Sequence, residues 1–101
     1  MEFSGFEWDQ GNRSKCQKHG VSPQAIEGLF SGPVAILPDS EHSEEEHRFR
    51  AIGRTKQGRA VFVVFTLRRR DAEVLIRPIN ARYMHDKEVK SYESQNPSLP
   101  K

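Results

Sequence analysis

The N-terminal third of the chain has the hydrophobic pattern of a short strand followed by two helices. Residues 3–8 are rich in aromatic side chains and could form an edge strand. Asp9 and Ser22 are suitable helix N-caps, and Gly20 can adopt the left-handed conformation that ends a helix. In the second helix the apolar residues recur at intervals of three and four positions: Ile26, Leu29 and Phe30. These features predict two successive helices.

The following part of the chain has mainly the pattern of β-strands. A short strand is expected at residues 34–37, and an acidic polar segment follows it. Turn signals then separate three β-rich runs, at residues 48–53, 59–67 and 73–80. Residues 60–65 are continuously apolar, which is typical of a central strand covered on both faces. The pattern therefore predicts an antiparallel meander.

A final helix is expected at residues 81–93. Its proposed core face carries Ala81, His85, Val89 and Tyr92. The complete order is β-α-α-β-β-β-β-α, which predicts an α+β fold with two N-terminal helices and one C-terminal helix packed on a twisted antiparallel β-sheet. We expect residues 1–95 to form a single domain and residues 96–101 to be a flexible C-terminal tail.

Composition limits the class of protein. A chain of 101 residues suits one domain with a modest core. Hydrophobic residues make up 35% and charged residues 30%, a polar composition that allows a partner to cover part of the surface. No apolar run approaches the ~20 residues that cross a bilayer, and the N-terminus lacks the layout of a signal peptide. The single Cys16 cannot form an internal disulfide, so we expect a cytoplasmic protein with no membrane partner.

Charge is distributed unevenly along the chain. Residues 1–50 hold five Lys/Arg against nine Asp/Glu, whereas residues 51–101 hold eleven against five, so the halves carry −4 and +6. A basic half of this kind creates a strong positive field, and a polyanion is its natural partner. The basic residues considered for this surface are Arg54, Lys56, Arg59, Arg68, Arg69, Arg70, Arg77, Arg82, Lys87 and Lys90.

Two sets of arginines have different predicted surroundings. Arg77 shares a strand face with apolar neighbours, where a buried guanidinium would need an anion. That anion could be an internal carboxylate such as Glu73 or the phosphate of a substrate, and the pattern leaves both open. Arg69 and Arg70 lie in a predicted turn, where we expect them to be merely solvated.

Two histidines could transfer protons, because imidazole titrates near neutral pH. His19 lies at the predicted end of the first helix, where its alternative role is to cap the helix. His85 lies on the last helix, where its alternative role is to pack in the core. Cys16 has His19 one turn later, but proximity within one helix is a weak indication of a thiol nucleophile. The acidic and histidine residues between positions 39 and 47 match no known metal-site spacing, which favours a solvated loop. We therefore expect neither a metal nor another cofactor.

Five short motifs follow one another along the chain. They are Phe6-Glu7-Trp8-Asp9, Lys18-His19-Gly20-Val21-Ser22, Arg48 with Ile52-Gly53, Gly58-Arg59, and Ile76-Arg77-Pro78-Ile79-Asn80-Ala81-Arg82-Tyr83. In this order and spacing the chain resembles the BrnT toxin family over about positions 6 to 93, with a departure at Asn80, where many relatives carry Ser. The resemblance implies a RelE-like fold, ribonuclease activity that inhibits translation, and neutralisation by a BrnA-type antitoxin. The implied assembly is a toxin–antitoxin heterotetramer that binds its own operator DNA through the antitoxin.

The resemblance also suggests residues for metal-free RNA cleavage, in which the ribose 2′-hydroxyl attacks the adjacent phosphorus. The candidate catalytic residues are His19, Arg59, Arg77 and His85. The candidate RNA-binding residues are Lys18, Arg48, Lys56, Arg68, Arg82 and Tyr83. The alternative function is a non-catalytic basic module that binds nucleic acid or protein, and the residues alone leave that alternative open.

Overall fold

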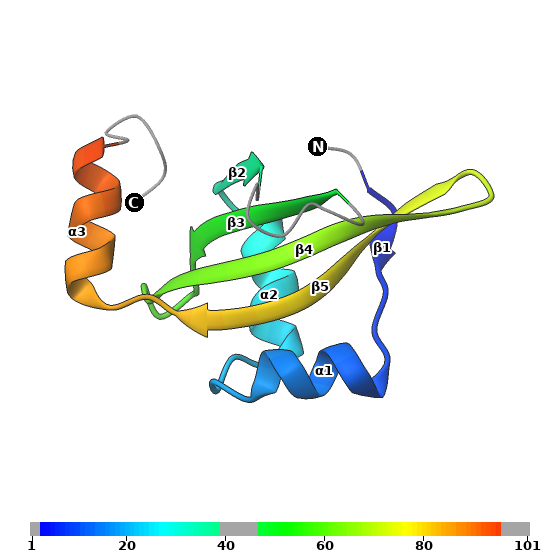
Figure 1. The fold of residues 1–101 in the computed structure, drawn as a ribbon, viewed down its shortest axis with the longest axis horizontal. Helices are drawn as coiled ribbons and strands as arrows, with labels where there is room; N and C mark the ends of the chain where they lie inside the picture. Colours follow the sequence, from blue (N-terminus) through cyan, green and yellow to red (C-terminus); the bar gives the residue numbers. More distant parts are fainter. Residues whose placement is uncertain (1–2, 39–46, 96–101) are drawn as a thin grey trace.

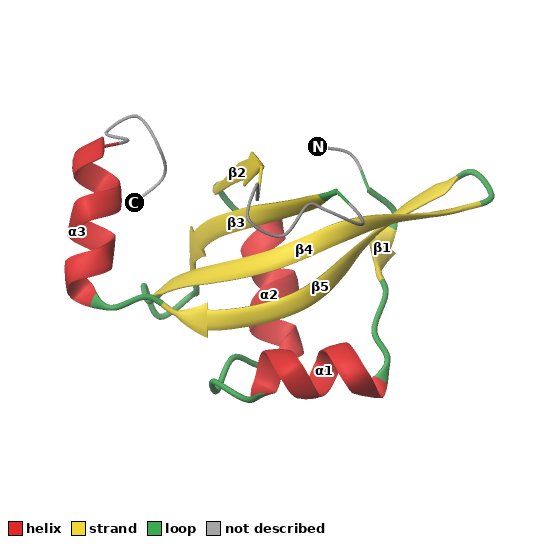
Figure 2. Cartoon of the chain, viewed as in Figure 1, coloured by secondary structure: helices red, strands yellow, loops and turns green. Residues whose placement is uncertain are grey.

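The computed structural model describes residues 3–38 and 47–95 (Figure 1). Within these residues, strands and helices follow one another in the predicted order β-α-α-β-β-β-β-α (Figure 2). Their bounds are β1 Gly5–Phe6, α1 Gln10–Gln17, α2 Pro23–Ser31, β2 Val34–Pro38, β3 Arg48–Arg54, β4 Ala60–Arg70, β5 Glu73–Tyr83 and α3 Asp86–Gln95. The expected α+β class is therefore confirmed.

The described strands form one mixed sheet in the order β1-β5-β4-β3-β2. β4 lies at its centre, as its continuous apolar sequence predicts. Strands β2 to β5 pair antiparallel, which confirms the predicted meander. β1 differs from the expected pattern because it pairs parallel with β5, with Phe6 opposite Ile76. The direction of a short edge strand depends on the route of the chain around the sheet, which its side-chain pattern does not record.

The helix ends form where the local signals predict them. Asn12 N–H donates to the Asp9 carboxylate at 3.0 Å, and Ala25 N–H donates to the Ser22 hydroxyl at 3.1 Å. Gly20 has a φ of 86°, the left-handed conformation expected after the first helix. The Asp9 and Ser22 side chains thus satisfy backbone N–H groups at the starts of α1 and α2, and Gly20 follows the end of α1 in the left-handed conformation.

One face of the sheet packs against the helices. α2 crosses behind the strands in the view of Figure 1, and α1 lies beside β5. The buried core consists of Cys16, Val21, Ile26, Leu29, Ala51, Val61, Val63, Phe65, Ile76 and Ala81. The predicted stripe of α2 is confirmed, since two of its members belong to this core and Phe30 packs against it. At Gly53 of β3 a Cβ would lie 3.0 Å from the Leu29 side chain, so a larger residue there would require Leu29 of α2 to shift by a few tenths of an ångström.

The opposite face of the sheet has apolar residues beneath arginines, and we call it the arginine face. Cross-strand register places Arg50 of β3 and Arg82 of β5 on the two sides of β4. Both guanidinium groups lie over the Phe62 ring, at 5.7 Å and 4.9 Å from its centroid. Val64 of β4 lies on this face and is only 7% exposed. Long arginine stems can cover apolar strand residues while their charged ends remain near water.

The end of β4 differs from the predicted bound. β4 continues to Arg70 and β5 begins at Glu73, so the expected turn shrinks to two residues, of which Asp71 has a φ of 55°. The β4–β5 hairpin therefore extends well beyond the rest of the sheet (Figure 1). Extended pairing of the two strands satisfies backbone groups that a longer turn would leave to water.

The last helix begins five residues later than predicted. Ala81 pairs with Val63 of β4 and is 1% exposed, so sheet pairing and burial outweigh the helical pattern there. Ala81 is a core residue as expected, but it belongs to β5 and not to the helix. The predicted core face is wrong for His85, which is exposed, while Val89 and Tyr92 are half-buried on α3. The proposed tail and most of the acidic segment lie outside the described residues. Among the described helices, none has the length and hydrophobicity needed to cross a membrane.

Candidate functional site

Basic side chains from α1 and three strands surround two adjoining hollows on the arginine face. The hollows have volumes of about 320 and 270 Å³ and share Lys15, Arg48 and Ile79 in their walls. We call their union the His19 groove. Its polar wall residues are Asn12, Lys15, Lys18, His19, Arg48, Arg68, Arg77 and Asn80. The groove therefore brings together five of the predicted site residues: Lys18, His19, Arg48, Arg68 and Arg77.

α1 forms one wall of the His19 groove because Asn12 fastens it to β5. The Asn12 side-chain amide donates to the carbonyl oxygens of Pro78 at 2.8 Å and Glu7 at 3.0 Å. Asn12 is 4% exposed, so these bonds are shielded from water. The backbone of α1, which carries Lys15, is thus held beside β5.

A β-bulge in β5 determines which side chains face the groove. Val64 pairs with Asn80 while Phe65 pairs with Pro78, so Ile79 is an extra residue in β5. Without the bulge, strict alternation would put Arg77 and Asn80 on opposite faces, since their positions differ by an odd number. With the bulge, both residues lie on the arginine face. The neighbouring proline suits this position because it cannot donate a hydrogen bond to the ladder.

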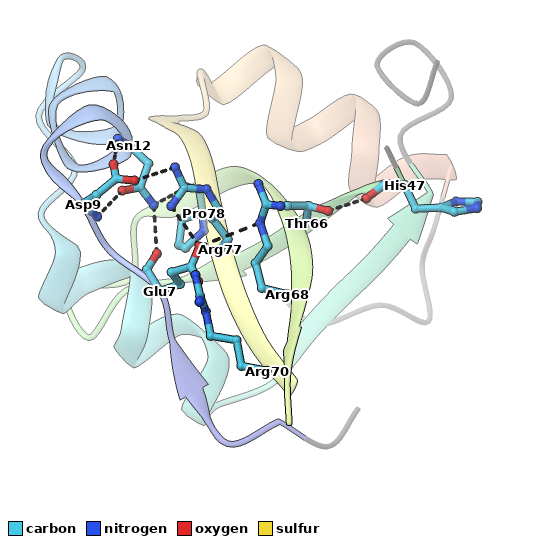
Figure 3. A network of polar contacts seen from close by, with 9 residues as sticks. All are labelled: Glu7, Asp9, Asn12, His47, Thr66, Arg68, Arg70, Arg77 and Pro78. Atoms are coloured by element: carbon cyan, nitrogen blue, oxygen red, sulfur yellow. Dashed lines mark hydrogen bonds and ion pairs between the residues drawn. The ribbon is translucent and has the colours of Figure 1, made fainter. Parts of the chain in front are cut away.

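Figure 3 shows three arginines gathered around the Glu7 carboxylate, an arrangement that we call the Glu7 cluster. Arg77 Nη1 donates to Glu7 Oε1 at 3.2 Å, and Arg70 Nε donates to Glu7 Oε2 at 2.7 Å. Arg68 Nε lies 3.8 Å from Glu7 Oε1. The Glu7 side chain is 17% exposed, which limits the screening of these ion pairs by solvent.

Asp9 completes the surroundings of Arg77. Arg77 Nη2 donates to Asp9 Oδ2 at 2.8 Å. The backbone N–H of Asn12 and the Arg77 guanidinium lower the pKa of the Asp9 carboxyl. The internal anion predicted for Arg77 therefore exists, but Glu7 and Asp9 provide it in place of Glu73. The expectation of a merely solvated Arg70 is wrong, since the long hairpin brings it to Glu7.

Besides Asn12, Lys15 and Asn80 of the groove wall, sequence reasoning missed Glu7. It stands in the Phe6-Glu7-Trp8-Asp9 motif, yet nothing in its local pattern indicates a contact with arginines more than 60 positions away. Glu7 accepts one of the five N–H donors of the Arg77 guanidinium and Asp9 accepts a second, so three donors remain for other acceptors.

A separate hollow of about 670 Å³ lies among the start of α2, the β3–β4 turn and the end of β5. We call it the Arg59 groove, and its charged and aromatic wall residues are Arg54, Lys56, Arg59 and Tyr83. Arg59 Cζ lies 3.5 Å from the centroid of the Tyr83 ring, a stacked arrangement of guanidinium and aromatic ring. The structure therefore separates three predicted site residues, Lys56, Arg59 and Tyr83, from His19 and Arg77.

Arg82 and His85 lie apart from both grooves, next to α3. Arg82 donates to both carboxylate oxygens of Glu88, at 2.8 and 2.7 Å. Hydrogen bonding with Arg82 lowers the pKa of Glu88 to about 2, and the same pair raises the pKa of Arg82. The His85 backbone N–H donates to Glu88 at 3.2 Å, while its side chain is exposed. His85 lines neither groove, so the structure does not bring the two predicted catalytic histidines together.

Neither a thiol nor a metal centre is indicated by the described residues. Cys16 is 0% exposed in the core, and burial raises the pKa of its thiol to about 11, which opposes formation of a thiolate nucleophile. Residues 3–38 and 47–95 contain no group of three or more His, Cys, Asp or Glu placed to hold a metal ion.

The sequence was compared with models of known protein families. A family model described as the ribonuclease toxin BrnT of a type II toxin-antitoxin system matches residues 8–88. The chain belongs to the BrnT family of ribonuclease toxins. The resemblance of the short motifs is thereby confirmed, and a toxin of a type II system has an antitoxin as its partner. No curated protein matches the chain. The matched range includes every polar wall residue of both the His19 groove and the Arg59 groove.

Proposed function

We propose that this BrnT-family ribonuclease cleaves single-stranded RNA in the His19 groove without a metal ion. One observation carries the proposal: an imidazole and cations from α1, β3, β4 and β5 line two adjoining hollows that share Lys15 and Arg48. Fixed cations can stabilise the charge that develops on phosphoryl oxygens, and an imidazole can move a proton near neutral pH.

The proposed reaction is an internal transfer at phosphorus. The ribose 2′-oxygen forms a bond to the adjacent phosphorus and loses its proton, while the bond to the 5′-oxygen of the next nucleotide breaks and that oxygen gains a proton. The products are a 2′,3′-cyclic phosphate and a 5′-hydroxyl end. His19 takes part in proton transfer, and Arg48 and Arg77 stabilise the phosphoryl oxygens. Lys18 and Arg68 bind the flanking phosphates.

Arg77 is suited to this role because Glu7 and Asp9 hold it in place. A guanidinium whose position is fixed before the reaction needs no reorganisation when charge develops. The two carboxylates partly neutralise the positive charge of Arg77. Its contribution to catalysis therefore depends on the direction of its N–H donors rather than on excess positive charge. Glu7 is a positioning residue in this scheme.

The family membership supports the cellular part of the proposal. RNA cleavage by this chain would inhibit translation in the cytoplasm, and a BrnA-type antitoxin would neutralise it in a heterotetramer that binds operator DNA through the antitoxin. The polar composition of the chain is consistent with a partner that covers part of its surface.

The test measures cleavage of a fluorescent single-stranded RNA by the purified protein, with EDTA and with magnesium. We expect equal cleavage in both, and a loss of roughly 100-fold or more in rate for His19→Ala. Arg69→Ala, an exposed position on the hairpin outside both grooves, is the matched control and should cleave normally. Cleavage that EDTA abolishes and magnesium restores would refute the metal-free mechanism. Tight binding of RNA without any cleavage would favour the non-catalytic module.

A further inference from the structure

We propose that the Arg59 groove binds one nucleobase of the RNA, stacked on the Arg59 guanidinium, next to the nucleotides that occupy the His19 groove. The inference rests on the proposed function for the identity of the ligand. It concerns a second, separate subsite that takes a base rather than the reacting phosphate.

The first argument is the chemistry of the Arg59–Tyr83 stack. One face of the guanidinium lies on the Tyr83 ring, 3.5 Å from the ring centroid. The Arg59 side chain makes no hydrogen bond or ion pair with any other described residue, and the residue is exposed. A planar ligand can therefore stack on the second face. Unpaired RNA bases are recognised in this way, on aromatic rings and on arginine planes.

The second argument is a contrast with the other arginines near this end of the sheet. Arg82 is bound by both oxygens of Glu88, and Arg54 donates to the Gly58 carbonyl at 2.9 Å and to Glu93 at 3.5 Å. The guanidinium groups of Arg82 and Arg54 are thus bound by other residues of the chain. Arg59 instead has an aromatic partner, which directs its plane without neutralising its charge.

The third argument is space. The groove of about 670 Å³ falls in the range of small-molecule sites and exceeds either hollow of the His19 groove. Its α2 wall consists of small residues, among them Ala25 and Gly28. A Cβ at Gly28 would meet no atom within 4 Å, so the wall is open at this position. A base and its ribose can enter there without displacing a side chain.

The fourth argument is continuity with the His19 groove. His19 lines one groove and Ser22 the other, three positions apart in the connection between α1 and α2. Asn80 and Tyr83 are also three positions apart on β5, but strand alternation puts them on opposite faces of the sheet. Three peptide units span at most about 11 Å between Cα atoms. The described part of β1 pairs with β5 only at Leu75 and Ile76, so one RNA strand that passes around the edge of β5 near Asn80 and Tyr83 can reach both grooves.

The experiment uses a 2′-O-methyl oligoribonucleotide, which the protein cannot cleave because the attacking hydroxyl is blocked. A single abasic position is moved along the oligonucleotide, and binding is measured by fluorescence anisotropy. For the wild type we expect one abasic position to weaken binding roughly 5- to 100-fold, the range for a stacked base. Arg59→Ala should bind the intact oligonucleotide as weakly as the wild type binds the oligonucleotide with that abasic position. The abasic position should then cause no further loss of affinity in Arg59→Ala.

Two further variants separate stacking from charge and from folding. Arg59→Lys keeps the charge but loses the plane, so it should bind as weakly as Arg59→Ala while keeping the wild-type salt dependence. Gly28→Leu fills the groove from a helical position and should weaken binding without touching Arg59. Melting temperatures equal to that of the wild type show that each variant is folded, and Arg69→Ala again serves as the control.

Three results would overturn the subsite: an abasic scan with equal effects at every position, full affinity in Arg59→Lys, or an abasic loss that persists in Arg59→Ala. Parallel cleavage of an unmodified RNA tests the proposed function separately. If the wild type binds with the expected abasic pattern but does not cut, the ribonuclease mechanism fails and the base site stands. If the wild type cuts and Arg59→Ala binds and cuts equally well, the base site fails alone.

Discussion

The two faces of the sheet are made by the same strands but are held by different interactions. On the helix face, β4 contributes Val61, Val63 and Phe65, each at most 1% exposed. On the arginine face, β4 contributes Phe62 and Val64 beneath guanidinium groups that stack on rings or bind carboxylates. Burial of apolar side chains stabilises the helix face. These side chains make no polar interactions that a ligand could replace.

The difference between the faces indicates where stability and binding reside. Guanidinium groups on the arginine face have further N–H donors that a phosphate can accept. A face of this kind can take up RNA while Glu7 and Asp9 keep Arg77 in place, without loss of the core. Substitutions on the two faces should therefore separate stability from function.

The largest expected effect is on the helix face. Phe65→Ala removes a ring that is 0% exposed at the centre of the sheet, so we expect a loss of about 3–5 kcal/mol in the free energy of unfolding. Phe62→Ala, on the arginine face of the same strand, should cost about 1–2 kcal/mol because its ring is half-buried. Urea denaturation measures both. Equal losses would contradict the contrast between the faces.

An intermediate effect is expected in the Glu7 cluster. Glu7→Gln removes the charge that binds Arg77 and Arg70, so we expect a loss of about 1–3 kcal/mol in the free energy of unfolding. The matched control is Glu73→Gln, an exposed carboxylate on the hairpin, which should change stability by no more than about 0.5 kcal/mol. Chemical denaturation of both variants, monitored by the fluorescence of Trp8, decides the comparison. If Glu7→Gln were as stable as the wild type, Glu7 would not hold the arginines.

The smallest expected effect is at α3, where the Arg82–Glu88 pair is partly exposed. The folded-state pKa of Glu88, about 2, lies below its ordinary value of 4.5. The stabilisation is therefore complete above about pH 4.5 and is lost as the pH falls toward 2. Because the two side chains are 38% and 34% exposed, solvent screening limits the effect to less than about 1 kcal/mol.

An NMR titration of the Glu88 carboxyl tests this prediction. In the wild type the transition should lie near pH 2, and in Arg82→Ala it should return to the neighbourhood of 4.5. High salt should reduce the difference between the two proteins, since the pair is accessible to ions. A wild-type transition already near 4.5 would show that the pair does not form in solution.

Features that depend on neighbours in sequence could be predicted from the chain alone. The helix caps at Asp9 and Ser22, the stop at Gly20, the central position of β4 and the basic second half were all expected and are present in the structure. Each of these features depends on local backbone chemistry or on the spacing of hydrophobic residues, and both can be read within a single segment of the chain. The family membership also follows from short motifs in their order along the chain.

The composition of the sites depended on the tertiary structure. The bulge at Ile79 puts Arg77 and Asn80 on one face against the rule of alternation, and Asn12 binds Pro78 across 66 positions of sequence. The same folding separates Arg59 from Arg77, which sequence reasoning had placed in one catalytic set. Strand register and long-range hydrogen bonds decide these neighbours, because a periodic pattern shows which way a side chain points but not which distant residue it meets.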